Sequence, residues 1–240
     1  IKMSYILIIG AKSDIAKSLA RKYAQNGYNI YLASRQSEAL EAFANDIKIR
    51  TKRKVHCIEL DILNYSSHSM IYNTLNEKPL GVITVVGYLG NQQNSQNDFE
   101  ETQKIIDTNY TGIVSLLNII SNDFEKRKKG FIIGISSVSG DRGRKSNYLY
   151  GSSKAAYTSY LSGLRNRLYA ANIHVLTVKP GFVYTKMTKE LDLPKIITAH
   201  PDEVAEDIYS AQQKKKTIVY TKWFWKWIML IIRNIPEWLF

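Results

Sequence analysis

Tyr150 and Lys154 are the two side chains of this 240-residue chain whose types and spacing best suit acid–base chemistry. On a helix, residues four apart share one face and lie one turn from each other. A free tyrosine titrates near pH ~10, and a neighbouring ammonium group favours its phenolate form. We therefore interpret Tyr150 as a general acid whose pKa is lowered by Lys154. Because this pair also arises by chance on structural helices, its meaning depends on the surrounding sequence.

Two upstream segments support a chemical interpretation of the pair. An apolar run over residues 131–135 leads into a serine-rich turn, which places Ser137 thirteen residues before Tyr150. Asn109 lies further upstream, inside a helical pattern.

In this order and spacing the segments resemble the short-chain dehydrogenase/reductase family across roughly residues 3 to 220. The resemblance includes the strand–turn–helix pattern around Gly10 and the Pro180-Gly181 pair. It implies hydride transfer between a nicotinamide cofactor and a carbonyl/alcohol pair, in which the protein orients the cofactor. The implied catalytic residues are Asn109, Ser137, Tyr150 and Lys154.

The resemblance also implies a role for each catalytic residue. Tyr150 protonates the developing alkoxide, and Ser137 hydrogen-bonds the carbonyl oxygen as charge appears on it. Lys154 lowers the Tyr150 pKa and binds the nicotinamide ribose, while Asn109 holds a water in a relay to Lys154. Tyr148 has no lysine four residues further on, so we interpret it as substrate-facing or as a packing residue.

The first turn is an unusual version of the family's phosphate-binding loop. Relatives usually carry three glycines there, whereas this chain keeps Gly10 and has Asp14 and Ala16 at the other two positions. Alanine is tolerable at the third, where close helix packing is needed. A carboxylate near a diphosphate is repulsive unless it points away and caps the helix.

The end of the second predicted strand indicates the cofactor. An acidic residue there would bind the ribose 2′-hydroxyl and repel a 2′-phosphate. This chain has Ser34-Arg35 instead, with Lys12 on the first turn, which predicts NADP(H) with Arg35 as a planar clamp. The alternative is that Arg35 is a solvated loop charge.

Further cofactor contacts follow from the resemblance. Asp61 and Ile62 border the adenine, and Val183 and Thr185 meet the nicotinamide carboxamide. The family's Asn-Asn-Ala-Gly loop is replaced by Val85-Val86-Gly87-Tyr88, so only Gly87 is retained. The full predicted set is Gly10, Lys12, Ser13, Asp14, Ile15, Ser34, Arg35, Asp61, Ile62, Gly87, Tyr150, Lys154, Pro180, Gly181, Val183 and Thr185.

Apolar runs alternate with helical patterns along the chain, which predicts an α/β fold. We expect a doubly wound parallel sheet, the Rossmann fold, as a single domain over residues 3–220. A separate tail covers 221–240. The predicted strands are 5–9, 29–33, 55–60, 81–86, 131–135, 174–178 and 217–220. The predicted helices are 15–26, 37–49, 66–75, 99–109, 110–126, 148–171 and 201–213. Because most candidate residues directly follow strands, one cleft at the carboxyl ends is expected.

Composition and charge limit the classes of molecule that the protein is expected to bind. The formal net charge is +12, which suits anionic lipid or phosphorylated substrates. The sequence has no zinc-ligand spacing, helix-turn-helix pattern or RNA-binding signature, so no nucleic-acid partner is expected, and the scattered histidines predict no metal site. The single cysteine, Cys57, fits a reducing cytosol and an inert buried thiol. No signal peptide is expected, and Met3 is the expected native start.

The tail differs from the rest of the chain because it carries all four tryptophans, mixed with lysine and arginine. Its apolar run over 227–232 is far shorter than the ~20 residues needed to span a bilayer. The pattern is typical of an amphipathic membrane-associating helix lying on anionic lipid. It predicts a cytoplasmic protein that is peripheral on the inner face of the cell membrane. The alternative is a helix that docks into a subunit interface.

The tail and the Gly10 turn together resemble the reductase branch that includes decaprenylphosphoryl-2-keto-ribose reductase. This likeness implies a keto group on a polyprenyl-phosphate-linked sugar, reduced for cell-envelope polysaccharide biosynthesis. One alternative is another lipophilic ketone, of ketoacyl, sterol or retinoid-like type, and a second is a non-catalytic NADP-binding scaffold. Arg142, Arg144 and Lys145 form either a solvated loop or an anionic-substrate clamp. Family resemblance implies a homodimer or homotetramer through the long middle helices.

Overall fold

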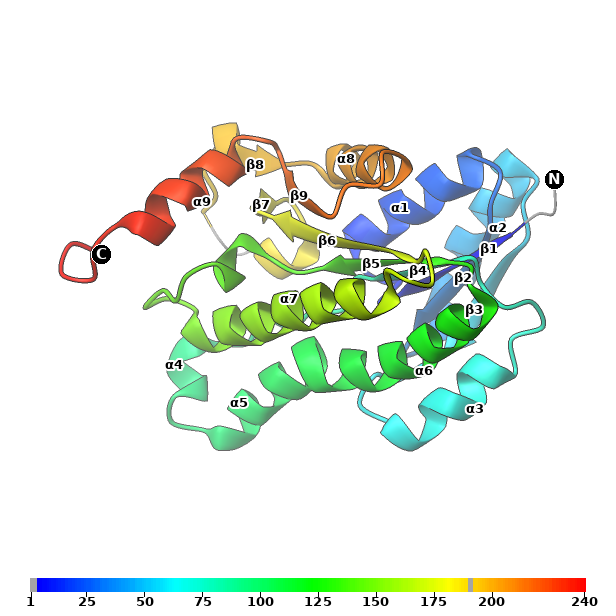
Figure 1. Cartoon of the computed structure of the whole chain (residues 1–240), viewed down its shortest axis with the longest axis horizontal. Helices are drawn as coiled ribbons and strands as arrows, with labels where there is room; N and C mark the ends of the chain where they lie inside the picture. Colours follow the sequence, from blue (N-terminus) through cyan, green and yellow to red (C-terminus); the bar gives the residue numbers. More distant parts are fainter. Residues whose placement is uncertain (1–3, 190–191) are drawn as a thin grey trace.

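One parallel sheet organises the part of the chain that the computed structural model describes, residues 4–189 and 192–240. Met3, the expected start of the domain, lies outside these residues. Seven strands pair in the order β3-β2-β1-β4-β5-β6-β9 (Figure 1). Their bounds are β1 Tyr5–Ile9, β2 Asn29–Ser34, β3 Val55–Glu59, β4 Gly81–Thr84, β5 Phe131–Ile135, β6 His174–Pro180 and β9 Ile218–Thr221. The order reverses between β1 and β4, so the predicted doubly wound sheet is confirmed and its crevice lies at their carboxyl ends.

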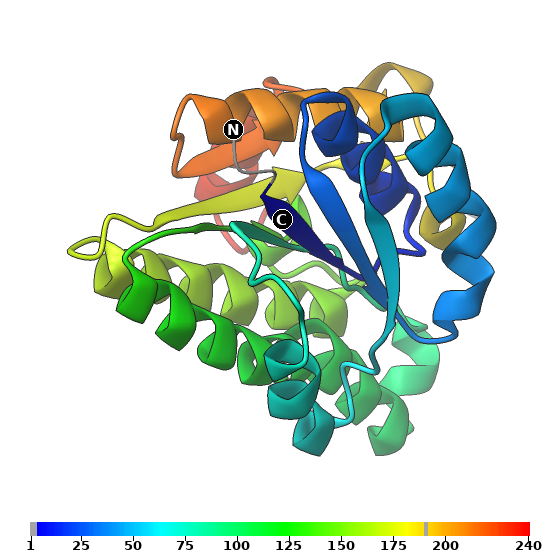
Figure 2. The ribbon, with the colours of Figure 1, turned by 90° about the vertical axis from the view of Figure 1, so that its right-hand side faces the viewer.

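Helices cover both faces of the sheet, and Figure 2 shows the twisted strands between the two helical layers. Helices α1, α2 and α8 lie on one face, and α3, α6 and α7 lie on the other. The described helices are α1 Asp14–Gln25, α2 Glu41–Thr51, α3 His68–Asn73, α4 Gln92–Ser95, α5 Phe99–Ile106, α6 Gly112–Arg127, α7 Tyr148–Leu168, α8 Pro201–Gln213 and α9 Trp225–Asn234.

The central strands β1, β2, β4 and β5 are mostly apolar because both of their faces are buried, whereas the edge strands β3 and β9 are partly exposed. In β1, Ile6 and Ile8 belong to the core under α1 and α8, whereas Leu7 and Ile9 belong to the core over α6 and α7. This pattern explains why the strand centres were predictable from sequence.

The middle helices depart from the prediction. Two helices were expected to meet at residues 109 and 110, but α5 and α6 form one continuous rod joined by a π-helical turn over Asp107–Thr111. A π-helical turn inserts an extra residue into the rod, and such turns are frequent at functional sites. Gly112 follows the turn, and a Cβ there would lie 2.4 Å from the carbonyl oxygen of Ile62. Glycine therefore lets the rod approach the loop after β3.

Short elements at the carboxyl edge were not predicted. They are α4 and a two-stranded parallel sheet of β7 Phe182–Val183 with β8 Thr198–Ala199. Strand β4 ends at Thr84 rather than at residue 86. Elements of two to four residues carry too little periodicity to be recognised in a sequence.

Helix α9 is attached to the domain by one of its faces. Trp225 and Met229 are buried against Val138, with Phe182 packed beside them. The Trp225 indole lies so close to Gly181 that a Cβ there would be 2.0 Å from the ring, and its Nε1 donates to the Ile197 carbonyl at 3.2 Å. Gly181 is therefore required by the packing of α9.

The other face of α9 is open. Trp223, at the start of this segment, is 74% exposed, Trp227 is 54% exposed and Ile231 is 66% exposed. Figure 1 shows α9 projecting beyond the sheet, with the C-terminus at the far end. Among the described residues, no helix is long and apolar enough to cross a membrane.

The two neighbouring tryptophans allow a matched test of this packing. We expect Trp225→Ala to lower the free energy of unfolding by about 3–5 kcal/mol, because it opens a cavity against Gly181 and Val138. We expect Trp223→Ala to change the free energy of unfolding by less than about 0.5 kcal/mol. Urea denaturation followed by far-UV circular dichroism, with limited proteolysis of α9, measures both. Equal effects of the two substitutions would show that α9 is not docked as described.

Candidate active site

A cavity of about 1250 Å³ lies at the carboxyl ends of the strands. Every predicted cofactor-contact residue lines it, and so does Ser137. Asn109 does not line it but is fully buried beside it. The structure thus brings the predicted residues into one site, as their positions after successive strands imply.

Tyr150 and Lys154 lie in the first two turns of α7, with the Lys154 ammonium 5.8 Å from the centroid of the Tyr150 ring. The Lys154 side chain is buried, and its Nζ donates to the carbonyl oxygens of Val86 at 3.1 Å and Ile135 at 3.2 Å. These carbonyls belong to the segment that follows β4 and to the last residue of β5. The ammonium is therefore held between two neighbouring strand ends.

Ser137 is brought against Tyr150 by close packing between two backbone segments. A Cβ at Gly151 would lie 2.7 Å from the Ser139 carbonyl oxygen, and one at Gly140 would lie 2.8 Å from the Ala155 nitrogen. Both positions need glycine for the serine turn to rest directly on α7. In this position the Ser137 side chain hydrogen-bonds that of Tyr150.

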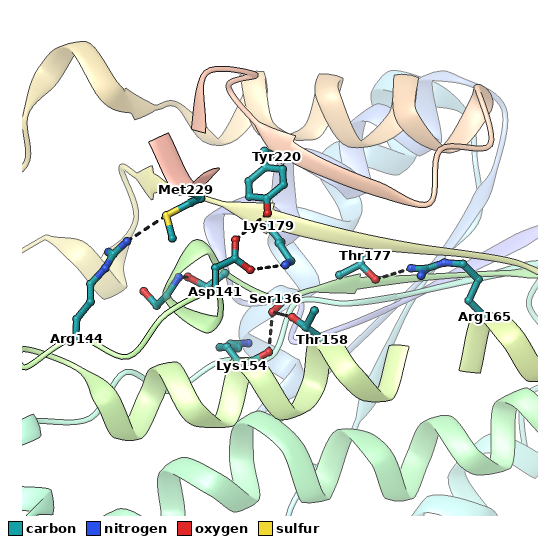
Figure 3. Close-up of polar contacts among 12 residues, drawn as sticks. Ser136, Asp141, Arg144, Lys154, Thr158, Arg165, Thr177, Lys179, Tyr220 and Met229 are labelled. Atoms are coloured by element: carbon teal, nitrogen blue, oxygen red, sulfur yellow. Dashed lines mark hydrogen bonds and ion pairs between the residues drawn. The ribbon is translucent and has the colours of Figure 1, made fainter. Parts of the chain in front are cut away.

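Ser136 adds a second tie between the same segments (Figure 3). Its hydroxyl donates to the Lys154 carbonyl oxygen at 3.0 Å and lies 2.7 Å from the Thr158 hydroxyl. Ser136 thus links the end of β5 to α7.

The direction of the Tyr150 pKa shift corrects the sequence interpretation. Burial raises the pKa of Tyr150 to about 12, and the hydrogen bond to Ser137 only partly opposes it. Burial also lowers the pKa of Lys154 to about 8. The predicted lowering of the Tyr150 pKa by Lys154 is not found, because burial dominates and Lys154 is not among the groups that shift this pKa. Tyr150 therefore keeps its proton at neutral pH, as a proton donor must.

Asn109 uses its side chain to hold the loop after β4. Its Oδ1 accepts from the Tyr88 backbone nitrogen at 2.8 Å, and its Nδ2 donates to the Tyr88 carbonyl oxygen at 2.8 Å. A Cβ on Gly87 would lie 3.7 Å from both Asn109 Oδ1 and Lys154 Nζ. The predicted water relay from Asn109 stays a prediction, and the structure adds a positioning role for this side chain.

The phosphate turn accommodates its unusual aspartate through a distant loop. Gly10 has a φ of +84°, and a Cβ there would lie 2.9 Å from the Val85 carbonyl group. The Asp14 carboxylate accepts the backbone N–H of Lys186 at 2.9 Å, so a loop distant in sequence binds it. Asp14 and Ile15 line the cavity at the start of α1, where the first backbone N–H groups have no partner within the helix. Such a helix start attracts phosphate.

The end of β2 combines two cations with one unpredicted acid. Arg35 is exposed and lines the cavity, and Lys12 donates to the Gln36 side chain at 2.8 Å. Glu59, at the end of β3, accepts the backbone N–H groups of Gln36 at 2.8 Å and Ser37 at 2.7 Å. These bonds and the nearby Lys12 lower the Glu59 pKa. Sequence analysis missed Glu59 because it searched for an acid at the end of β2.

The predicted basic loop divides into residues with different surroundings. Arg142 donates to the carbonyl oxygens of Ile232, at 2.6 Å, and Ile235, forms an ion pair with Glu237 at 3.0 Å, and stacks on Phe240. It therefore binds the end of α9 and does not line the cavity.

Arg144 lines the cavity, whereas Lys145 is exposed. Tyr148 is also exposed and donates to the Gln96 side chain at 3.4 Å. Burial raises the pKa of the Cys57 thiol to about 11. Within residues 4–189 and 192–240, no group of three or more His, Cys, Asp or Glu side chains could hold a metal ion.

The site fits a dinucleotide. The Gly10 turn and the start of α1 line the cavity where a pyrophosphate would bind, and Arg35 with Lys12 offers cations for a phosphate on the adjoining ribose. At the other end of the cavity, Tyr150 and Lys154 lie where a nicotinamide ribose and a reacting carbonyl would meet. The donor set therefore suits NADP(H).

Comparisons with known proteins agree with this geometry. A family model described as short chain dehydrogenase matches residues 4–195. An uncharacterized oxidoreductase of Mycobacterium tuberculosis is 29% identical over 235 residues, covering 97% of this chain and 94% of that protein. 17-beta-hydroxysteroid dehydrogenase type 3 of Homo sapiens is 31% identical over 206 residues, covering 85% and 66%.

Among solved structures, a short-chain dehydrogenase from Sphingobium yanoikuyae in complex with NADPH has a similar fold. Its TM-score is 0.84 at 19% identity, covering 98% of this chain and 97% of that one.

Lys154 makes the stability of the cofactor-free protein depend on pH. Its pKa falls from the ordinary 10.5 to about 8 on folding, so between these values the unfolded chain holds a proton that the folded chain lacks. Stability therefore rises with pH in this window. From about pH 7.5 to about pH 9.5 we expect the wild type to gain about 2 kcal/mol relative to Lys154→Met, measured by urea denaturation. Lys145→Met controls for the general loss of one positive charge. A constant difference across the window would contradict the buried ammonium.

Proposed function

The chain belongs to the short-chain dehydrogenase/reductase family, and on that premise we propose that it is an NADPH-dependent reductase of a keto group. One observation carries the proposal. Ser137, Tyr150 and Lys154 converge at one end of a cavity whose other end offers a helix start and two cations. A nicotinamide dinucleotide spans these two ends.

The chemistry follows from the protonation states of this chain's residues. Bound NADPH supplies the hydride. Tyr150 holds a proton on its hydroxyl oxygen at neutral pH and donates it to the carbonyl oxygen as that oxygen becomes an alkoxide. The Ser137 hydroxyl donates a hydrogen bond to the same oxygen. Lys154 keeps a positive charge nearby, because its pKa of about 8 leaves most of it protonated near pH ~7.

The cofactor choice rests on the groups at the end of β2. Arg35 presents a planar guanidinium, which binds phosphate in a bidentate manner. The acid found there, Glu59, has its carboxylate bound to backbone N–H groups and so is occupied. The similar Sphingobium yanoikuyae structure contains NADPH. These points support NADP(H) over NAD(H).

For the substrate we propose a keto-sugar linked to a polyprenyl phosphate, used in cell-envelope polysaccharide biosynthesis. The open face of α9 supports a membrane-bound substrate, because Trp223 and Trp227 are largely exposed beside the exposed Lys226. Tryptophan and lysine together suit the headgroup region of anionic lipid. The protein would lie on the cytoplasmic face of the membrane as a peripheral homodimer or homotetramer.

A second candidate substrate is another lipophilic ketone, such as a steroid. The similarity to 17-beta-hydroxysteroid dehydrogenase type 3 favours it. The same cavity and the same α9 surface would serve such a substrate. A cationic side chain at the substrate end of the cavity would then have no anionic group to bind. A non-catalytic scaffold is disfavoured by the intact arrangement of Ser137, Tyr150 and Lys154.

The first experiment measures NADPH oxidation by the purified protein, supplied with organic-extractable or aqueous fractions of source cells. We expect turnover with the organic fraction. We expect Tyr150→Phe to lower the rate by more than about 10³-fold, because it removes the proton that is transferred, and to leave NADPH binding intact. Tyr148→Phe is the matched control and should keep its activity. Turnover by Tyr150→Phe at the wild-type rate would refute the catalytic assignment, and turnover with only the aqueous fraction would refute the lipid-borne substrate.

Membrane binding has its own test. Replacing both Trp223 and Trp227 by Ser is expected to reduce co-sedimentation with anionic phosphatidylserine/phosphatidylcholine vesicles at least about tenfold, because burial of the two rings is lost. Tyr169→Ser, which removes another exposed aromatic side chain, is the control. Equal vesicle binding by the double variant and the wild type would show that these tryptophans do not bind the membrane.

A further inference from the structure

The charges that line the cavity are unevenly distributed. Its acidic lining residues, within the described part of the chain, are Asp14, Glu59 and Asp61. Asp14 lies at the start of α1, Glu59 ends β3, and Asp61 follows β3. Each of these carboxylates accepts a backbone N–H group. These acids therefore belong to the cofactor end, and their charges are partly satisfied there.

The substrate end is lined by cations instead. Besides Lys154, the lining there includes Lys104 and Arg144 and no described acid. Lys104 lies 3.9 Å from Glu101, which is not part of this lining. A wall of one sign raises the local concentration of the opposite sign. This end of the cavity is suited to an anionic substrate.

Arg144 differs from its neighbour Arg142 in what it binds. The Arg142 guanidinium is occupied by α9 carbonyls and Glu237. The hydrogen bond of Arg144 goes to the Met229 sulfur at 3.2 Å, a weak acceptor (Figure 3). Among the described residues no acid forms an ion pair with Arg144, although it is half-buried.

The acid whose charge acts on Arg144, Asp141, is already bound by other residues. Asp141 is buried, with one carboxylate oxygen bound to Lys179 and the other accepting from the Tyr220 hydroxyl at 2.7 Å (Figure 3). Burial lowers the pKa of Arg144, and the charge of Asp141 only partly opposes this effect. The chain thus keeps a desolvated guanidinium in its cavity without giving it a carboxylate, which costs free energy unless a ligand supplies the anion.

We propose that Arg144 binds a phosphate group attached to the ketone substrate, and so selects phosphorylated over neutral ketones. The planar guanidinium fork matches phosphate oxygens, as an ammonium does not. Ser146, Asn147 and Tyr150 line the same part of the cavity, so the phosphate lies near the reacting carbonyl. Met229 lies on the buried face of α9, opposite its open face, and contacts the guanidinium from there. The inference rests on the proposed reductase function and specifies its substrate class.

The test uses two matched pairs of ketones with NADPH. Dihydroxyacetone phosphate and dihydroxyacetone form the soluble pair, and 1-palmitoyl-dihydroxyacetone phosphate and its dephosphorylated form are the lipid pair. We expect the wild type to favour the phosphorylated member in kcat/KM. Arg144→Gln should reduce that preference at least about 30-fold, because a charge-assisted bidentate bond is lost. Arg144→Lys keeps the positive charge but not the planar guanidinium. Its preference for the phosphorylated ketone should lie between those of the wild type and Arg144→Gln.

Lys145→Gln, on the same loop but exposed, should keep the wild-type preference. A preference in either pair supports the assignment, and the pair that shows it identifies a soluble or a lipid carrier. An unchanged preference in Arg144→Gln, with wild-type circular dichroism and thermal midpoint, would overturn it.

A second measurement separates this inference from the proposed function. If the wild type oxidises NADPH with none of the four ketones, the reductase proposal lacks support, but Arg144 can still be tested by binding. Isothermal titration of inorganic pyrophosphate into NADP⁺-saturated protein avoids the cofactor's own phosphate sites. We expect Arg144→Gln to weaken this binding at least about tenfold and Lys145→Gln to leave it unchanged. Equal binding by Arg144→Gln and the wild type would overturn the assignment independently of turnover.

Discussion

The active site depends on one backbone contact, the packing of the serine turn after β5 directly on α7. Gly140 and Gly151 make this contact possible, because a Cβ at either position would collide with the opposite backbone. Ser136 then links the two segments through the Lys154 carbonyl oxygen. As a result Ser137 reaches Tyr150 across a gap that no pair of larger residues would allow. The side chains that we propose to react are thus placed by rigid elements, as a precise site requires.

Desolvation sets the protonation states within that contact. Tyr150 is buried enough that its pKa is raised to about 12, while the pKa of Lys154 falls to about 8. Lys154 tolerates burial because the carbonyl oxygens of Val86 and Ile135 accept hydrogen bonds from its ammonium group. On the other side of the same turn, Asp141 is bound by Lys179 and Tyr220. The turn is therefore fixed from both sides by buried polar contacts, which are costly to break singly.

Sequence analysis was most successful where a residue's type is dictated by its place after a strand. The sheet order and the gathering of Gly10, Asp61 and Ser137 in one cavity follow from burial of both sheet faces. The family resemblance is confirmed by the family model. Contacts between distant segments were not predictable. Nothing local indicates that Asp14 accepts the N–H group of Lys186, or that Glu59 binds the turn after β2. Nor does the sequence show that Gly181 is small because Trp225 packs on it.

Helix α9 links the substrate side of the cavity to the protein surface. Its inner face contacts Gly181 through Trp225 and Arg144 through Met229, so it supports two segments that line the cavity. Its outer face exposes large apolar side chains. Exposed apolar surface of this kind marks a site that binds a protein or a membrane. A partner on the outer face would therefore contact a helix whose inner face packs on Gly181 and Arg144, and both of these residues line the cavity.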